Sequence, residues 1–225
     1  MSTPVIRFSF DYISNNAYLA WTQLPALAAK YGYAIEPIPV LFAGLLGAHG
    51  TLGPAEIPAK SRWMVKNTAR KAIRLGLPLG APAFHPFNPL LALRVSSLPL
   101  EPTARDALVD ALFKAVWARG LHVSEPAIVV QVASEIGLDG AALVADATRP
   151  ETKERLRRQT DDAIARGVFG VPTMEVGDEL FWGYDDFPQL EMVLAGEDPL
   201  AGSWLTGQFP TARPSAMRKQ VRDRR

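Results

Sequence analysis

Residues 6–19 read IRFSFDYISNNAYL and join the pattern of a β-strand to that of a helix start. Ile6, Phe8 and Phe10 alternate with other residues, which is typical of a strand that buries one face. A short turn follows, and Ser14 stands where the helix would begin. Because the first N–H groups of a helix lack partners and carry a partial positive charge, this position favours an anion. The stretch therefore predicts a strand, a turn and a helix whose start suits a negatively charged group.

The residues that follow extend this start into a β-α-β unit and then into a long helical region. Helical periodicity over residues 17–31 ends at Gly32, and residues 34–40 are strand-like despite two prolines. From about residue 42 to residue 165 we find no convincing strand. Helices are expected over residues 60–75, over 104–119 with a cap from Thr103 to Asp106, from Pro126 after a Ser124 cap, from Asp139, and over 151–166.

Two long uncharged stretches, residues 37–55 and 75–93, lie at the start of this region and inside it. Each is interrupted by prolines, and the first also by glycines, so neither could keep the continuous backbone bonding that a bilayer demands. We interpret both as apolar loops that line a site, and expect no membrane association.

The sheet pattern returns near the other end of the chain. Residues 173–176 and 179–182 flank Gly177-Asp178, a two-residue hairpin turn, and a last helix capped by Asp185 or Asp186 is expected to run to Gly196. More than a hundred intervening residues are too many for one crossover connection. We therefore predict an α/β fold in which residues 4–41 and 150–197 form a discontinuous domain, residues 42–149 an inserted all-helical domain, and residues 198–225 a tail.

Composition excludes several classes of chemistry. The 225 residues are 48% apolar and 21% charged and include no cysteine, so disulfides, thiolate metal sites and Cys-x-x-Cys redox pairs are excluded. The three histidines lack metal-ligand spacing and no glycine-rich phosphate loop is present, so neither a metal nor a nucleotide cofactor is expected. Any reactive sulfur must arrive on a small molecule. With no secretory signal pattern, we expect a cytoplasmic location.

The net charge of +1 is unevenly distributed. Residues 211–225 hold six basic side chains against one acidic side chain, which leaves the rest of the chain net negative. A nucleic-acid surface would need basic residues on the folded body. We expect no nucleic-acid partner and a solvated tail whose removal leaves folding and turnover nearly unchanged.

Five segments together resemble the 2-hydroxychromene-2-carboxylate isomerase family, a DsbA-like thioredoxin branch related to the kappa-class glutathione transferases. They are residues 10–20 (FDYISNNAYLA), 53–60 (GPAEIPAK), 85–94 (HPFNPLLALR), 167–173 (GVFGVPT) and 181–183 (FWG). The resemblance covers approximately residues 5–195. It implies a thioredoxin-like domain with a large helical insertion, glutathione as cofactor, a small aromatic carboxylate as substrate, and a homodimer.

The resemblance also implies a thiol site. Ser14 would be catalytic, donating its hydroxyl to the glutathione thiolate, and the alternative reading is that it only caps the helix. Pro172 is expected to follow a cis bond, so that the main chain of Val171 pairs with glutathione as it would with an extended peptide. The alternative is a trans proline that begins a strand.

Further contacts follow from the resemblance. Thr51, the Tyr184 backbone and Asp185 would contact glutathione, with the last two at its γ-glutamyl amine and carboxylate; plain helix capping is the alternative for Asp185. The substrate pocket would be formed by Trp63, Asn67, Phe87 and Asn88, with Phe84 and His85 nearby. Core packing explains Trp63, Phe84 and Phe87 equally well, and His85 is expected to be structural.

Some positions depart from the family pattern. Asn15 stands where proline is usual, and Ala17 where a small hydroxyl residue is usual. A lysine and an asparagine are expected near Gly47 and Thr51, and Asp186 follows Asp185 where arginine is usual. The expected activity is isomerisation by thiolate addition, bond rotation and elimination. The alternatives are a kappa-type transferase or peroxidase, which would consume glutathione, and a non-catalytic thioredoxin-like binding module.

Overall fold

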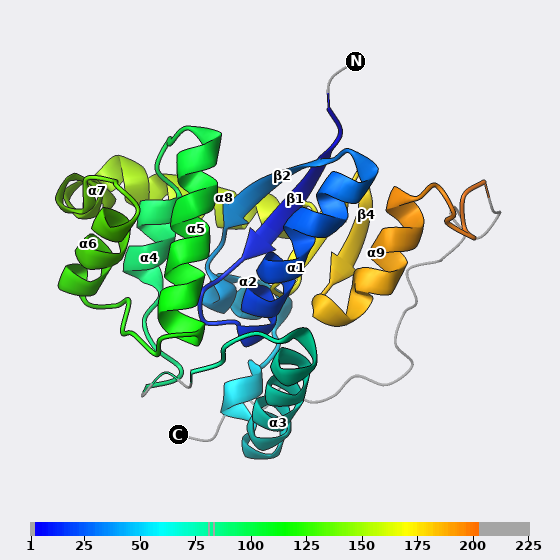
Figure 1. Cartoon of the computed structure of the whole chain (residues 1–225), viewed down its shortest axis with the longest axis horizontal. Coiled ribbons are helices and arrows are strands. Elements are labelled where there is room, and N and C mark those ends of the chain that lie inside the picture. The colour runs from blue at the N-terminus through cyan, green and yellow to red at the C-terminus, as the bar shows by residue number, and fades with distance from the viewer. Residues whose placement is uncertain (1–2, 81, 83, 203–225) are drawn as a thin grey trace.

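The computed structural model describes residues 3–80, 82 and 84–202, and places helices on both faces of a four-stranded sheet (Figure 1). The strands are β1 (Val5–Phe10), β2 (Ala34–Pro39), β3 (Thr173–Val176) and β4 (Glu179–Trp182), in the order β2-β1-β3-β4. β1 and β2 are parallel, with Phe8 opposite Pro37, whereas β3 is antiparallel to both of its neighbours. The β-α-β unit and the hairpin expected from the sequence are both present.

The helices between β2 and β3 gather mostly at one end of the molecule, where Figure 1 shows α4 to α7 side by side, with α9 beyond the other edge of the sheet. The helices are α1 (Asn15–Tyr31), α2 (Phe42–His49), α3 (Pro58–Leu75), α4 (Leu90–Ser96), α5 (Pro102–Trp117), α6 (Pro126–Glu135), α7 (Gly140–Ala147), α8 (Pro150–Ala165) and α9 (Phe187–Leu194), with single 3₁₀ turns η1 (Pro54–Glu56) and η2 (Tyr184–Asp186). The domain boundaries given above stay a prediction.

The two faces of the sheet are buried differently. Ile6, Phe8 and Phe10 are fully buried on the face covered by α1 and α5, where the Phe10 and Phe113 rings lie 5.3 Å apart. The other face is covered by α2 and α8 through a smaller apolar cluster that includes Leu45 and Ala163. Burial of this apolar surface is the main stabilising contribution to such a fold, at about 25 cal/mol per Å².

The interpretation of both uncharged stretches as loops is wrong in part. α2 lies inside the first stretch, and α4 begins at Leu90, inside the second. Of the α2 glycines that indicated a loop, Gly44 instead permits close packing, since a Cβ there would lie 3.0 Å from Thr160 Cγ2 on α8. No helix in the described residues is both long and apolar enough to span a membrane.

Several helix ends differ from the expected ones. α5 begins at Pro102 after Glu101, so Thr103 lies inside the helix, because proline is well suited to the first helical position. The Ser124 hydroxyl donates to the Asn88 carbonyl (2.7 Å) and does not cap α6. Asp186 accepts from the Trp182 N–H (2.8 Å) and neither it nor Asp185 caps α9 through its side chain. A helix does follow Asp139, as predicted, and the Asp139 side chain caps it as α7. The basic part of the tail lies outside the described residues.

Candidate functional site

Ser14 lies where β1 gives way to α1, and its hydroxyl makes two contacts. It accepts a hydrogen bond from the Ala17 N–H (3.2 Å) as the N-cap of α1, and it donates to the Val171 carbonyl (3.3 Å). The capping role is therefore present. The second contact joins the helix start to the loop before β3, a pairing 157 residues apart in sequence.

The loop before β3 is held firmly in place. The Val171–Pro172 bond is cis, as predicted, and the Pro172 carbonyl accepts from the Gly183 N–H (2.8 Å). A Cβ on Gly170 would lie 2.5 Å from Trp182 Nε1, so this position accepts only glycine without movement. Within the described part of the chain no hydrogen bond from the Val171 N–H is found.

The turn from Asp11 to Ser14 is fixed from three directions. Asp11 is buried and its carboxylate accepts from the Ile13 N–H (3.1 Å) and from the Phe42 N–H at the start of α2 (2.9 Å). Burial raises the pKa of Asp11 to about 7, and the two N–H groups offset part of that rise. Trp117 Nε1–H donates to the Tyr12 carbonyl (2.9 Å), and His85 Nε2 lies 3.0 Å from the Ile13 carbonyl oxygen. These contacts hold Ser14 in a defined position.

Asp185 lies close to the first turn of α1, but it is already paired. Its carboxylate lies 2.7 Å from Lys71 Nζ, and the same ammonium is 3.5 Å from Asn16 Oδ1 and 5.9 Å from the centre of the Tyr184 ring. The Lys71 side chain is 8% exposed and that of Asp185 is 66% exposed. The structure thus brings Asp185 and Tyr184 together with a buried lysine that the sequence reasoning missed.

Two of the four residues predicted for the substrate pocket share one face of α3 with this lysine. Trp63, Asn67 and Lys71 follow one another at intervals of four residues, and such residues lie on one side of a helix. Trp63 is 59% exposed, Asn67 is half-buried, and Lys71 meets the start of α1. We call these three residues the α3 stripe.

The other predicted site residues have local roles. Phe87 is buried in the main apolar core, and Asn88 Oδ1 accepts from the Leu90 N–H (3.0 Å) at the start of α4. Thr51 is exposed just beyond α2, and its backbone N–H donates a hydrogen bond to the Leu46 carbonyl (3.0 Å). No hydrogen bond among the described residues joins any of these three to Ser14.

Lys71 and Trp117 were missed because their importance depends on burial. The signal available was periodicity, since Thr68 and Ala72, which flank Lys71 on α3, are both buried and indicate the inward face. Trp117 ends α5, and nothing in its own neighbourhood points to the distant Tyr12 carbonyl. His85 was expected to be structural, and the structure shows that what it supports is the Ser14 turn.

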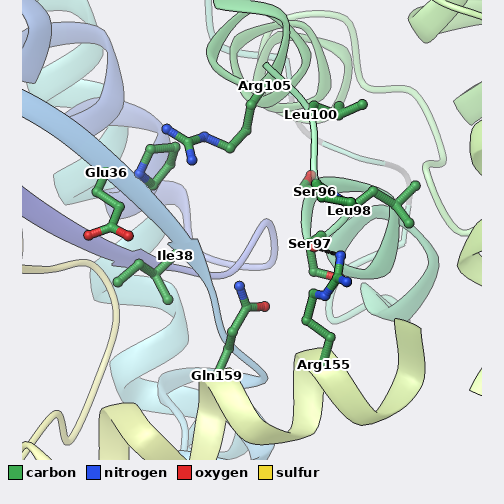
Figure 2. Close-up of a pocket in the computed structure, with 11 residues that line it drawn as sticks. Glu36, Ile38, Ser96, Ser97, Leu98, Leu100, Arg105, Arg155 and Gln159 are labelled. Atoms are coloured by element: carbon green, nitrogen blue, oxygen red, sulfur yellow. Dashed lines mark hydrogen bonds between the residues drawn. The ribbon is translucent and has the colours of Figure 1, made fainter. Parts of the chain in front are cut away.

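Two hollows on the described part of the chain differ in their relation to this site. The one in Figure 2, about 230 Å³, lies between β2, α4, the start of α5 and α8; Gln159 points toward its middle, Arg105 extends from α5 toward the β2 side, and Arg155 points toward Ser97. None of the predicted site residues lines it. A larger hollow of about 490 Å³ is bounded by α1, the end of α3, η2 and α9, and its lining includes Tyr184 and Asp185. Among the described residues no group of three acidic or histidine side chains could hold a metal ion.

Comparisons with known proteins identify the family and the fold of this chain. A sequence model of the DsbA-like thioredoxin domain family matches residues 5–195. The 2-hydroxychromene-2-carboxylate isomerase of Sphingobium xenophagum is 31% identical over 194 residues, which are 85% of this chain and 98% of that protein. Glutathione S-transferase kappa 2 of Caenorhabditis elegans is 26% identical, over 88% of this chain and 94% of that protein.

Solved structures confirm the fold. A 2-hydroxychromene-2-carboxylate isomerase superposes with a TM-score of 0.80 at 30% identity, over 85% of this chain and 95% of that one. The cytosolic disulfide reductase DsbM from Pseudomonas aeruginosa, solved with glutathione, gives a TM-score of 0.59 at 16% identity, over 90% and 99% of the two chains, which shows likeness of fold alone. The expected thioredoxin-like fold with a helical insertion is thereby confirmed.

Proposed function

The chain belongs to the 2-hydroxychromene-2-carboxylate isomerase family of DsbA-like thioredoxin proteins. We therefore propose that it is a glutathione-dependent isomerase of 2-hydroxychromene-2-carboxylate or of similar intermediates in the degradation of aromatic compounds. The observation that supports this most is the meeting of the Ser14 hydroxyl with the Val171 main chain at the start of α1. A thiolate sulfur bound there would accept a hydrogen bond from the Ser14 O–H and lie in the electric field of the helix N-terminus. Since the chain has no cysteine, that sulfur belongs to a small molecule.

Glutathione suits the site along its length. Its cysteinyl residue would pair with the N–H and C=O of Val171 as an added strand does. The exposed carboxylate of Asp185 would take the γ-glutamyl ammonium at the edge of the larger hollow, beside the Tyr184 backbone. Thr51, which is exposed beyond α2, would add a weaker contact to glutathione.

The chemistry is a reversible addition. The glutathione thiolate forms a C–S bond with the alkene carbon next to the aromatic ring. The alkene electrons shift toward the carbon that carries the hydroxyl group and the carboxylate, and the bond from that carbon to the ring oxygen breaks, which leaves a phenolate and an enol. Rotation occurs about the former double bond; the enol then returns to a ketone as its electrons re-form the alkene, the C–S bond breaks with its electrons on sulfur, and the enol proton passes to the phenolate. A trans alkene is released, and glutathione is not consumed. Ser14 acts by stabilising sulfur as an anion before attack and after elimination.

The acceptor would lie against the exposed end of the α3 stripe. Trp63 offers an aromatic face and Asn67 a carboxamide that can bond a carboxylate or phenol oxygen. Because Phe87 is buried and Asn88 bonds the Leu90 N–H, these two residues would support the acceptor pocket from within the fold and not contact the acceptor directly.

Glutathione binding is tested by thermal unfolding and calorimetry, followed by an assay. A ligand at a hundred times its dissociation constant adds about 2.7 kcal/mol to the free energy of unfolding. The assay follows conversion of 2-hydroxychromene-2-carboxylate to its trans-alkene isomer with total glutathione measured in parallel. Absence of both a thermal shift and a calorimetric signal at saturating glutathione would exclude the cofactor.

A kappa-type transferase is the second candidate, favoured by the similarity to the kappa enzymes. Loss of glutathione in step with product would select it. The homodimer is a further proposal, which sedimentation equilibrium would test, and a cytoplasmic location likewise remains an expectation.

A further inference from the structure

Lys71 is an unusual residue for the inward face of α3. Lysine is almost never buried unless it is paired, because the ammonium loses its hydration. The other basic residues of α3 are exposed: Lys60, Arg62, Lys66, Arg70 and Arg74. Lys71 alone turns inward, to the junction of α3, η2 and the first turn of α1.

The negative charge that the protein places near the Lys71 ammonium offsets its positive charge only in part. Among the described residues its ion-pair partner is Asp185, which is largely exposed and therefore screened by water. Asn16 offers an amide oxygen at 3.5 Å, which carries no charge. The first turn of α1 contains no acidic residue, so the partial positive charge of the helix start adds to that of Lys71. The Lys71 ammonium and the start of α1 are thus both positive, and the carboxylate paired with Lys71 is exposed.

We propose that the buried Lys71 ammonium holds the sulfur of a thiol bound at Ser14 in its anionic form. This inference rests on the proposed function, and it assigns to Lys71 a part that the Ser14 hydroxyl alone does not supply. When the ligand ammonium binds Asp185, it takes up part of the charge that had balanced Lys71. The bound thiol then loses its proton to solvent, and the sulfur retains the electron pair and restores the balance. Lys71 is a positioning residue, since it acts on the bound sulfur through its electric field and through its ion pair with Asp185.

Other titratable groups face the same region and must be kept constant. Asp11 and His85 contact the turn that carries Ser14, and Tyr184 lies over Lys71. None of these is altered in the variants below. Lys66, which is exposed on the same helix, supplies the matched control.

The test measures the pKa of glutathione bound to the full chain, from the ultraviolet absorbance of the thiolate at a series of pH values. Lys71→Met is expected to raise the pKa of the bound thiol by about one unit, which is about tenfold less thiolate at neutral pH. Lys71→Arg keeps the charge and is expected to remain near wild type, as is Lys66→Met. S-methylglutathione, which has no ionisable sulfur, is titrated in parallel.

The outcomes separate the inference from the function on which it rests. A raised pKa in Lys71→Met alone supports the proposal. If Lys71→Met weakens glutathione and S-methylglutathione equally and leaves the bound thiol's pKa unchanged, Lys71 only places Asp185 and the proposal is overturned while the glutathione site stands. If wild-type protein binds neither glutathione nor S-methylglutathione, both the proposed function and the role of Lys71 are wrong. Should Lys71→Met fail to fold, Lys71→Gln keeps hydrogen-bond donors without the charge and gives the same comparison.

Discussion

At the scale of single residues, the Ser14 oxygen serves the fold and the candidate site at once. It accepts a hydrogen bond from the Ala17 N–H as a cap, and its O–H donates a hydrogen bond to the Val171 carbonyl, for which a bound thiolate would compete. An N-cap contributes about 1 kcal/mol, whereas a hydrogen bond to a charged group contributes about 1.5–3 kcal/mol. The two roles therefore differ in the quantity they change, stability or turnover.

Ser14→Ala should lower turnover at neutral pH by about 10- to 100-fold, because the thiolate loses its hydrogen bond. Its free energy of unfolding should fall by only about 1 kcal/mol. Asp139→Ala is the matched control, since Asp139 caps α7 through the Ala142 N–H (3.0 Å) and lies outside the proposed site. It should lose similar stability and keep wild-type turnover. Wild-type activity in Ser14→Ala would show that Ser14 is a cap alone.

At the scale of secondary structure elements, α2 shows how close packing changes the meaning of glycine. Gly44 faces Thr160 of α8, whose hydroxyl donates to the Leu156 carbonyl (2.9 Å) and accepts from the Leu41 N–H (3.0 Å). That threonine is fixed by two hydrogen bonds and cannot turn away easily. Gly47 lies one turn further along α2, and a Cβ there would meet nothing within 4 Å.

The two glycines should respond to alanine with opposite signs. Gly44→Ala forces the buried Thr160 to move and should destabilise the protein by about 1–3 kcal/mol. Gly47→Ala adds helix propensity without a clash and should stabilise by about 0.5–1 kcal/mol. Urea unfolding measures both. Equal effects of the two substitutions would mean that α2 does not pack on α8 as described.

At the scale of the whole molecule, the buried Asp11 links stability to pH. An unfolded aspartate titrates near 3.8, and burial raises the pKa of Asp11 to about 7. Between these values the folded protein binds a proton that the unfolded chain does not, so the Asp11 contribution to the free energy of unfolding falls as pH rises. The slope is about 1.4 kcal/mol per pH unit, and the loss is complete above about pH 7.

Asp11→Asn removes this titration. As pH rises from about 4 to about 7, the stability of the variant relative to wild type should shift in its favour, by an amount on the order of a few kcal/mol. Asparagine can accept only one of the two N–H bonds that Asp11 accepts, and this lowers the stability of the variant at every pH. The informative quantity is therefore how the difference in free energy of unfolding between variant and wild type changes with pH. Denaturant unfolding at several pH values provides it, with Asp178→Asn in the exposed hairpin turn as control. A difference that stays constant with pH would show that Asp11 titrates normally.

The sequence by itself determined the features that depend on neighbouring residues. Apolar residues at every second position identified β1, and Gly177-Asp178 identified the hairpin. Gly32 and Gly76 marked the ends of α1 and α3. The lack of cysteine assigned any sulfur chemistry to a small molecule. These inferences succeed because backbone preferences and capping act over a few residues.

Only the tertiary structure decided which residues meet at the candidate site. Lys71 and Asp185 are 114 residues apart, and Trp117 and Tyr12 are 105 residues apart. The burial of Lys71, the close packing of α2 on α8, and the support of the Ser14 turn all arise between elements distant in the chain. No local pattern encodes such contacts, because the free energy that selects them comes from burying the surfaces of several elements together.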